Sequence, residues 1–111
     1  MAQTQIFRGV QTTVCRTDRT IDGVYRSTRV CHAERIGEYV RIELNTAGWK
    51  TNTTKLRMNQ FAHQFCNSQY GVYQKAGEWF VAINGNCRPI RFDGRLVSFL
   101  IDAKHVQFKS N

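Results

Sequence analysis

The chain has 111 residues, of which 41% are hydrophobic and 22% are charged. These fractions are near the averages of globular domains and exclude a wholly disordered or low-complexity chain. The formal net charge of +8 favours anionic partners such as nucleic acid, although the same charge also keeps a small protein in solution. No apolar run approaches the roughly 18 residues of a membrane helix, so we expect no membrane partner.

We expect a single domain over residues 1–111, because the chain has one proline and no low-complexity tract that could form a linker. Residues 1–22 are interpreted as an arm or an extra strand, residues 24–101 as the core and residues 102–111 as a tail.

The first 23 residues carry weak signals. Residues 4–13 alternate loosely between apolar and polar side chains, which is typical of a strand or of a loosely attached arm. Residues 16–23 are polar and end in Asp22 and Gly23, a dipeptide that favours a turn. We therefore expect the core to begin after Gly23.

Two β-strands are predicted next. Residues 24–33 have the composition of one strand, residues 34–37 that of a turn, and residues 38–45 that of a cleanly alternating second strand. The apolar face of the second strand consists of Val40, Ile42 and Leu44. The two strands are expected to pair as a hairpin.

The apolar pattern then changes from strand-like to helical over residues 53–66. Apolar residues recur there at the spacing of one helix face, which consists of Met58, Phe61, Ala62 and Phe65. A threonine hydroxyl can accept a free amide of the first turn, so Thr53 or Thr54 is the expected N-cap.

Short strands follow the helix. Residues 70–75 and 79–84 are separated by a glycine-containing loop, and residues 88–92 suit an edge strand because they contain Pro89. Residues 95–101 are the most apolar run. The tail contains Val106 and Phe108 and would form a last strand or an extended arm.

The element order β-β-α-β-β-β, with further strands allowed at the ends, indicates an α+β fold. We expect a mostly antiparallel sheet with one helix packed on it.

Two long segments carry a family resemblance. Residues 44–60 have the sequence LNTAGWKTNTTKLRMNQ, and residues 70–81 have the sequence YGVYQKAGEWFV. They resemble the pattern LN-x-GGW-[RK]-T-x-TTK-x-RMNQ, followed by VYQK-x-G-x-W, of an uncharacterised family of small tailed-bacteriophage proteins. Ala47 departs from the pattern, which has a glycine there. The resemblance implies a phage origin and the cytoplasm of a host cell, and it implies no activity and no catalytic residue.

The stretch between Glu43 and Glu78 contains no acidic residue. The start of the predicted helix lies within it, and a helix N-terminus favours anions through its free amides and partial positive charge. We predict that the cations and hydroxyls of this stretch contact the phosphates of a nucleic acid, and they are Lys50, Thr51, Thr53, Thr54, Lys55, Arg57 and Lys75. Ordinary helix capping beside a solvated basic loop would explain the same residues.

The outward face of the predicted helix is a second candidate. Asn59, Gln60 and His63 lie opposite the apolar residues, and we expect them near the bases or sugars of a nucleic acid. Leu56 lies within the same arc and indicates a covered surface, which a protein could cover as easily as DNA.

The aromatic residues allow two interpretations. Trp49 and Trp79 are predicted to pack in the core or against the helix cap. If either ring is exposed beside Lys50 or Lys75, it becomes a platform on which bases could stack.

The sequence contains no recognisable catalytic set, so we expect a binding protein and not an enzyme, with no cofactor. The spacing of the four cysteines matches no zinc motif. We interpret them as small buried core thiols. The alternative is a zinc site assembled from Cys31, His32, Cys66 and either His63 or Cys87.

Different classes of function remain open. The first is a non-catalytic phage accessory protein that binds DNA or RNA through a basic helix N-terminus. The second is an inhibitor of a host enzyme or defence system, including an anti-CRISPR-like role, which would dock a host protein around Leu56. A sponge for a nucleotide signal is a third. Exposed strand edges would also allow a homodimer.

Overall fold

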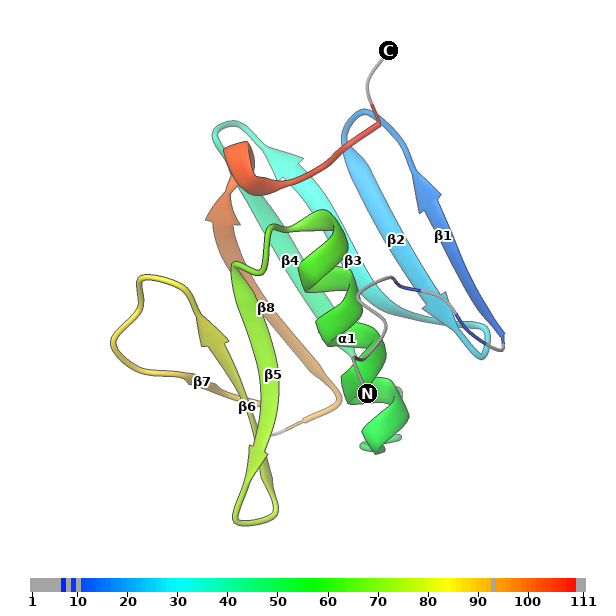
Figure 1. The fold of residues 1–111 in the computed structure, drawn as a ribbon, viewed down its shortest axis with the longest axis vertical. Coiled ribbons are helices and arrows are strands. Elements are labelled where there is room, and N and C mark those ends of the chain that lie inside the picture. The colour runs from blue at the N-terminus through cyan, green and yellow to red at the C-terminus, as the bar shows by residue number, and fades with distance from the viewer. Residues whose placement is uncertain (1–6, 8, 10, 93, 110–111) are drawn as a thin grey trace, which may run out of the picture.

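The computed structural model describes residue 7, residue 9 and residues 11–92 and 94–109. In this part of the chain, two antiparallel sheets and one long helix make up the fold (Figure 1). The larger sheet has the strand order β1-β2-β3-β4-β8, and the smaller sheet has the order β5-β6-β7. The expected α+β class, with mostly antiparallel sheet and one packed helix, is confirmed.

The bounds of the elements are β1 Thr12–Arg16, β2 Thr20–Tyr25, β3 Thr28–Ile36, β4 Tyr39–Asn45, α1 Asn52–Phe65, β5 Tyr70–Lys75, β6 Glu78–Ile83, β7 Ile90–Arg91, β8 Leu96–Asp102 and the 3₁₀ helix η1 Ala103–His105.

The element order differs from the expected one, because four strands precede α1 and the strands divide between two sheets. Residues 24–33, which were expected to form one strand, contain a tight turn at Arg26 and Ser27 with φ angles of 51° and 62°. Two successive left-handed residues are typical of a two-residue hairpin turn, and Asn or Gly normally marks such a turn. Neither is present here, so no residue type indicated the break between β2 and β3.

The expected turn at Asp22 and Gly23 is wrong, since both residues lie within β2. A Cβ atom on Gly23 would lie 2.9 Å from Cζ of Phe7 and 3.0 Å from Cδ2 of Phe61. Gly23 therefore allows two aromatic rings to approach the sheet closely, which is a second reason for a glycine inside a strand.

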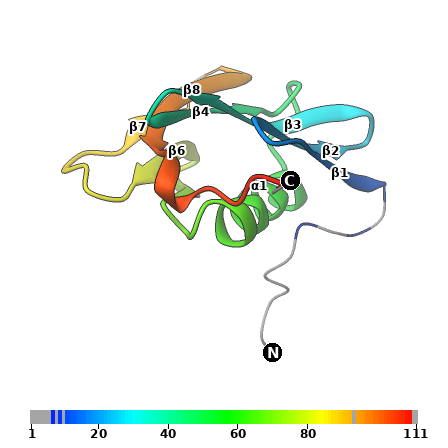
Figure 2. The same ribbon diagram turned by 90° about the horizontal axis from the view of Figure 1, so that it is seen from above.

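α1 packs on one face of the larger sheet, and the opposite face carries no other described element (Figure 2). Val40, Ile42 and Leu44 are fully buried beneath the helix layer, so the expected apolar face of β4 is confirmed. The expected apolar face of α1 is also confirmed, because Met58, Phe61, Ala62 and Phe65 are all buried in the same core.

α1 begins with Thr51 as its N-cap, in place of the expected Thr53 or Thr54. The Thr51 hydroxyl accepts the amide of Thr54 at 3.2 Å, and the two hydroxyl oxygens lie 3.1 Å apart. Threonine is frequent on both sides of the helix start, so composition alone could not select the residue at which the backbone turns.

The smaller sheet is joined to α1 by the side chain of Asn59. Its Oδ1 accepts the amide of Val72 at 2.7 Å, and its Nδ2 donates to the carbonyl of Val72 at 2.9 Å. Asn59 thus occupies the position that a neighbouring strand would take beside β5.

The tail is extended only in part, because Asp102 ends β8, residues 103–105 form η1, and residues 110–111 lie outside the described residues. After η1, the amide of Gln107 donates to the carbonyl of Phe65 at 2.8 Å, and the amide of Lys109 donates to the carbonyl of Thr17 at 2.9 Å. Val106 and Phe108 pack against the core. Among the described residues, no helix combines the length and apolar character needed to cross a membrane.

Candidate nucleic-acid interface

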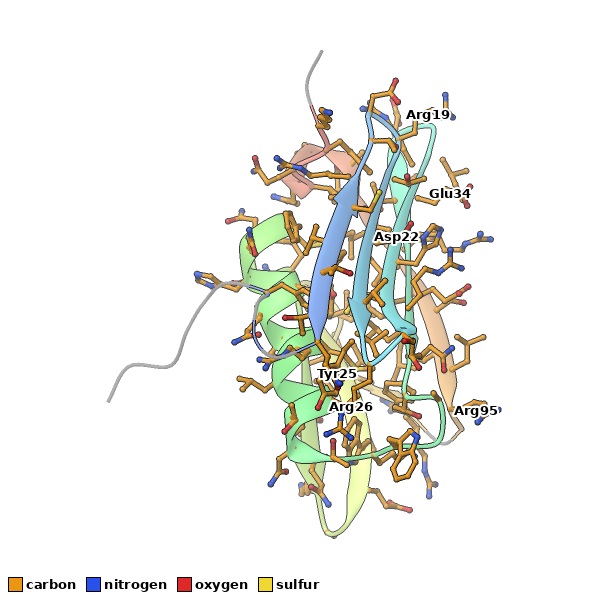
Figure 3. The ribbon with its side chains drawn as sticks, turned by 90° about the vertical axis from the view of Figure 1, so that its right-hand side faces the viewer. Arg19, Asp22, Tyr25, Arg26, Glu34 and Arg95 are labelled. Carbon is orange, nitrogen blue, oxygen red and sulfur yellow. The ribbon has the colours of Figure 1, made fainter. Side chains whose placement is uncertain are left out.

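Three segments meet at the start of α1: the β2–β3 turn, the loop from β4 to α1, and the first helical turn. Because β3 and β4 are antiparallel, the start of β3 and the end of β4 lie at the same end of the sheet. Figure 3 shows Tyr25 and Arg26 at this end of the molecule, with Arg95 on the far side of the loop, whereas Arg19 and Glu34 lie at the opposite end.

A pocket of about 80 Å³ opens between these segments. Its walls are Tyr25, Arg26, Thr28, Val30, Thr46, Trp49, Thr51 and Thr54. An engineered apolar cavity that holds benzene has a volume of roughly 150 Å³. A whole nucleobase is therefore too large to enter the pocket and would have to lie across its mouth.

Trp49 stands at the mouth of this pocket. Its side chain is 69% exposed, whereas Trp79 is 3% exposed. The expectation of core packing is confirmed for Trp79 and wrong for Trp49. The amide of Trp49 donates to the carbonyl of Thr46 at 2.8 Å, and Ala47 and Gly48 between them have φ angles of 54° and 86°. This tight turn holds the indole outside the core.

Two arginines lie over one ring at the pocket wall. The guanidinium carbon of Arg26 lies 5.5 Å from the centre of the Tyr25 ring, and that of Arg57 lies 5.7 Å from it. Arg57 also donates to Oε1 of Gln60 at 3.0 Å. Arg57 is therefore held in place by packing and hydrogen bonding, while Arg26 is exposed at the turn.

Two lysines lie over rings on the other sides of the helix start. Nζ of Lys55 lies 5.7 Å from the Trp79 ring centre, and Nζ of Lys50 lies 5.8 Å from the Phe92 ring centre. Lys50 also donates to the carbonyl of Phe92 at 2.8 Å. Contacts of this kind stabilise a cation without cancelling its charge.

The described carboxylates lie elsewhere. None of them comes within 4.0 Å of the basic groups of Arg26, Lys55 or Arg57. Asp93 lies outside the described residues. Among the predicted cations, Lys55 and Arg57 are thus not neutralised by a described carboxylate, and Arg26, which was not predicted, adds a third such charge.

A comparison of the sequence with known protein families finds one matching family. The family model described as "Kyanoviridae Gp96 protein" matches residues 1–98. The chain belongs to the Kyanoviridae Gp96 family. The resemblance to bacteriophage proteins is therefore confirmed. No curated protein and no solved structure matches the chain.

The predicted contacts differ in how this Gp96-family fold places them. Thr51 and Thr53 are exposed at the helix start, and Thr54 is buried behind them. Lys75 is exposed beside the β5–β6 turn, which projects at the same end of the molecule as the start of α1 (Figure 1). Thr51 and Thr53 are thus accessible at the helix start, whereas Thr54 lines the pocket.

The expected exposed arc of α1 is not formed as predicted. Gln60 is buried, so its outward position is wrong, and both polar atoms of the Asn59 amide are bonded to Val72. Leu56 is half-buried. His63 is exposed, with Nδ1 3.0 Å from the hydroxyl of Ser68. β5 packs against this side of the helix, and helical periodicity could not reveal a second sheet.

Sequence reasoning missed Tyr25, Arg26 and Arg95. Tyr25 and Arg26 were assigned to the interior of a strand because their turn carries no Gly or Asn. Nη2 of Arg95 lies 3.4 Å from where a Cβ of Gly48 would be, which places it at the loop although it is distant in sequence. A basic residue next to an aromatic one was the available signal, and it is a weak one.

The four cysteines differ in their exposure to solvent. Cys31 and Cys66 are buried as expected, whereas Cys15 and Cys87 are exposed, which corrects the interpretation of all four as core thiols. Burial raises the pKa of Cys66 to about 12 and raises the pKa of Cys31 well above its usual value. No group of three or more His, Cys, Asp or Glu residues in the described part of the chain could hold a metal ion, so the alternative zinc site is not assembled.

Proposed function

We propose that this phage protein binds nucleic acid at the start of α1, with an unpaired base stacked on Trp49. The observation that carries the proposal is the exposed indole beside a pocket walled by threonine hydroxyls and Arg26. An exposed tryptophan leaves apolar surface in contact with water. Stacking one base on the ring contributes about 1–3 kcal/mol to the binding free energy. The combination of an aromatic platform with nearby cations is typical of proteins that bind single strands.

The phosphates of the strand would follow the cations around this ring. Arg26 borders the pocket and also a shallow depression of about 570 Å³ beside Gln11, Thr13, Val24 and Ser27. A strand stacked on Trp49 could therefore continue past Arg26 toward β1 and β2. The further phosphate contacts in this proposal are Lys50, Thr51, Thr53, Lys55, Arg57 and Lys75.

Some residues that were predicted to contact nucleic acid have a structural role in this proposal. Thr54, Asn59 and Gln60 are engaged in the fold, and we assign them to positioning α1. His63 remains a proposed contact for a strand that extends along the helix. In this proposal the protein is a non-catalytic accessory factor that works in the host cytoplasm.

The first test is binding of labelled oligonucleotides of about 20 residues, as single-stranded DNA, single-stranded RNA and duplex, followed by fluorescence anisotropy at about 50 mM salt. We expect the single strands to bind more tightly than the duplex. The logarithm of the affinity should fall linearly with the logarithm of the salt concentration, because neutralised phosphates release counterions. Absence of binding by all three probes would contradict the proposal.

The second test isolates the indole. Trp49→Ala should lower the affinity for single strands by about 5-fold to 150-fold, which corresponds to the loss of one stacked base. Tyr39→Ala is the matched control, because Tyr39 is an exposed aromatic residue at the other end of β4. Equal losses in both variants would contradict a specific role for Trp49.

The two alternative functions, a nucleotide sponge and an inhibitor of a host protein, have less structural support. The pocket is too small to enclose a nucleotide, which disfavours a sponge for a nucleotide signal. For an inhibitor of a host protein, the exposed apolar side chains of β3, β4 and β8 are candidates, and they include Ile36, Tyr39, Leu96 and Leu100, whereas Leu56 is half-buried. A host complex that survives nuclease treatment and is lost in Leu100→Lys, but not in Trp49→Ala, would favour that alternative.

A further inference from the structure

In the part of the chain that the structure describes, the two sheets have four outer edges, and three of them are blocked or short. Asn59 occupies the hydrogen-bonding groups of Val72 on the edge of β5. β7 has two residues and follows Pro89. β1 has five residues, of which two are threonine and one is Arg16. Short strands, proline and charged residues are the features by which proteins protect sheet edges from pairing.

β8 is different, because it presents a long apolar edge. Its seven residues, LVSFLID, include no proline, lysine or arginine. Leu96 is 52% exposed and Leu100 is 54% exposed, both on the face away from α1. An edge of this length and composition is a template for another strand.

The direction of the free hydrogen-bonding groups on β8 follows from its pairing with β4. The amide of Thr46 donates to the carbonyl of Arg95 at 2.7 Å, and the amide of Ala103 donates to the carbonyl of Glu38 at 3.0 Å. In an antiparallel pair, such bonded positions alternate along the strand. The odd-numbered residues of β8 therefore bond to β4, and the backbone groups of Leu96, Ser98, Leu100 and Asp102 point to the open edge.

We propose that β8 pairs antiparallel with β8 of a second copy of this chain, about a two-fold axis at Ser98. This register bonds Ser98 to Ser98 of the second copy and Leu96 to Leu100 of the second copy. A shift that centres the axis on Phe99 would place Leu96 opposite Asp102 and lose the leucine pairs. The two larger sheets would join into one continuous sheet.

Charge complementarity selects a second copy in the antiparallel direction. β8 is preceded by the cation Arg95 and ends with the anion Asp102. In the register centred on Ser98, Asp102 of each copy lies opposite Gly94 of the other, one residue along the strand from Arg95, whereas in-register parallel pairing would bring like charges together. The edge is thus complementary to itself, which is what an isologous two-fold contact requires.

The oligomeric state of the full chain tests the proposal, by sedimentation velocity across a dilution series without nucleic acid. We expect a dimer that dissociates on dilution. Ser98→Pro removes an amide from the open edge and none from the β4 pairing, so it should give a folded monomer. The double variant Leu96→Lys/Leu100→Lys should also be monomeric, because edge lysines oppose strand pairing.

A cross-link tests the register. In a Cys15→Ser/Cys87→Ser background, Ser98→Cys should form a disulfide-linked dimer on mild oxidation, because the paired Cα atoms would lie about 5.5 Å apart. Arg41→Cys, on the same face but on the neighbouring strand, should remain uncross-linked. A chain that is monomeric at every concentration, a dimer that survives both edge variants, or a Ser98→Cys protein that does not cross-link would each overturn the proposal.

Discussion

Two regions of this protein hold cationic side chains by different contacts. On the outer face of the larger sheet, Arg29 lies 3.7 Å from both Asp22 and Glu43, and Arg41 lies 2.8 Å from Glu34. At the start of α1, Arg26 and Lys55 lie over aromatic rings, and no described carboxylate is near them. An ion pair cancels charge at close range, whereas a ring holds a cation in place and leaves its field intact.

This difference teaches where the excess charge of +8 can act. Counting basic residues along the sequence does not distinguish the two regions, because both contain arginine. The contacts do, because Arg29 and Arg41 are paired with carboxylates, whereas Arg26 and Lys55 are not. A polyanion should therefore be attracted more strongly to the start of α1 than to the outer face of the larger sheet.

Removing two charges from each region should give the largest contrast. Arg26→Gln/Lys55→Gln should weaken single-strand binding by about 100-fold, because each charge-assisted contact contributes about 1.5 kcal/mol. It should also lower the salt dependence by about two contacts. Arg29→Gln/Arg41→Gln removes the same charge from the outer-face ion pairs with Asp22, Glu43 and Glu34 and should leave both quantities near the wild-type values.

Anisotropy titrations of the two double variants at matched salt would check this contrast. Equal weakening would show that only net charge matters, and the comparison between the regions would fail.

A second prediction separates binding from packing on α1. Asn59→Ala should lower the free energy of unfolding by about 2 kcal/mol, because it leaves the amide and carbonyl of buried Val72 without partners. His63→Ala, on the exposed side of the same helix, is the control and should have little effect. Urea unfolding measures both. If Asn59→Ala weakened nucleic-acid binding at unchanged stability, Asn59 would belong to the interface.

The buried core disfavours the ionised forms of its thiol and phenol groups. We therefore expect the free energy of unfolding to fall at alkaline pH. The folded-state pKa values of Cys31, Cys66 and Tyr70 are raised, mainly by burial. Unfolded thiols release protons above roughly pH 8.5, so each buried thiol should cost up to about 1.4 kcal/mol of stability per pH unit above that value. Stability from these groups is fully present below that pH and is lost as the pH rises.

Urea midpoints between neutral and alkaline pH would measure this loss. Cys31→Ala should flatten the dependence, whereas Cys15→Ser, at an exposed thiol, should not change it. A midpoint that stays constant with pH would contradict the prediction.

The smallest effect is expected for the outer-face ion pairs. A double-mutant cycle on Glu34→Gln and Arg41→Gln should give a coupling free energy below about 1 kcal/mol, because both side chains are well exposed. A coupling of several kcal/mol would mean that these charges organise the sheet and do more than neutralise each other.

Sequence patterns predicted what depends on periodicity. The alternation in β4 and the helical spacing from Met58 to Phe65 fixed the two buried faces correctly. They could not predict the Arg26–Ser27 turn or the role of Gly23, since each depends on contacts between distant segments.

The acid-free stretch indicated the helix start as the candidate site, and nucleic-acid contact there stays a prediction. The exposure of Trp49 and the engagement of Asn59 depend on a loop conformation and on a second sheet that no local pattern encodes.

The order of the strands also has a consequence for folding. β4 and β8 are neighbours in space, but α1 and the whole smaller sheet lie between them in the chain. The first four strands can form by short-range hairpins, whereas β8 must close a loop of about 50 residues, and such non-local pairing is slow. During translation, the apolar edge of β4 therefore stays open until Asp102 has been synthesised, and the larger sheet is completed last although it is begun first.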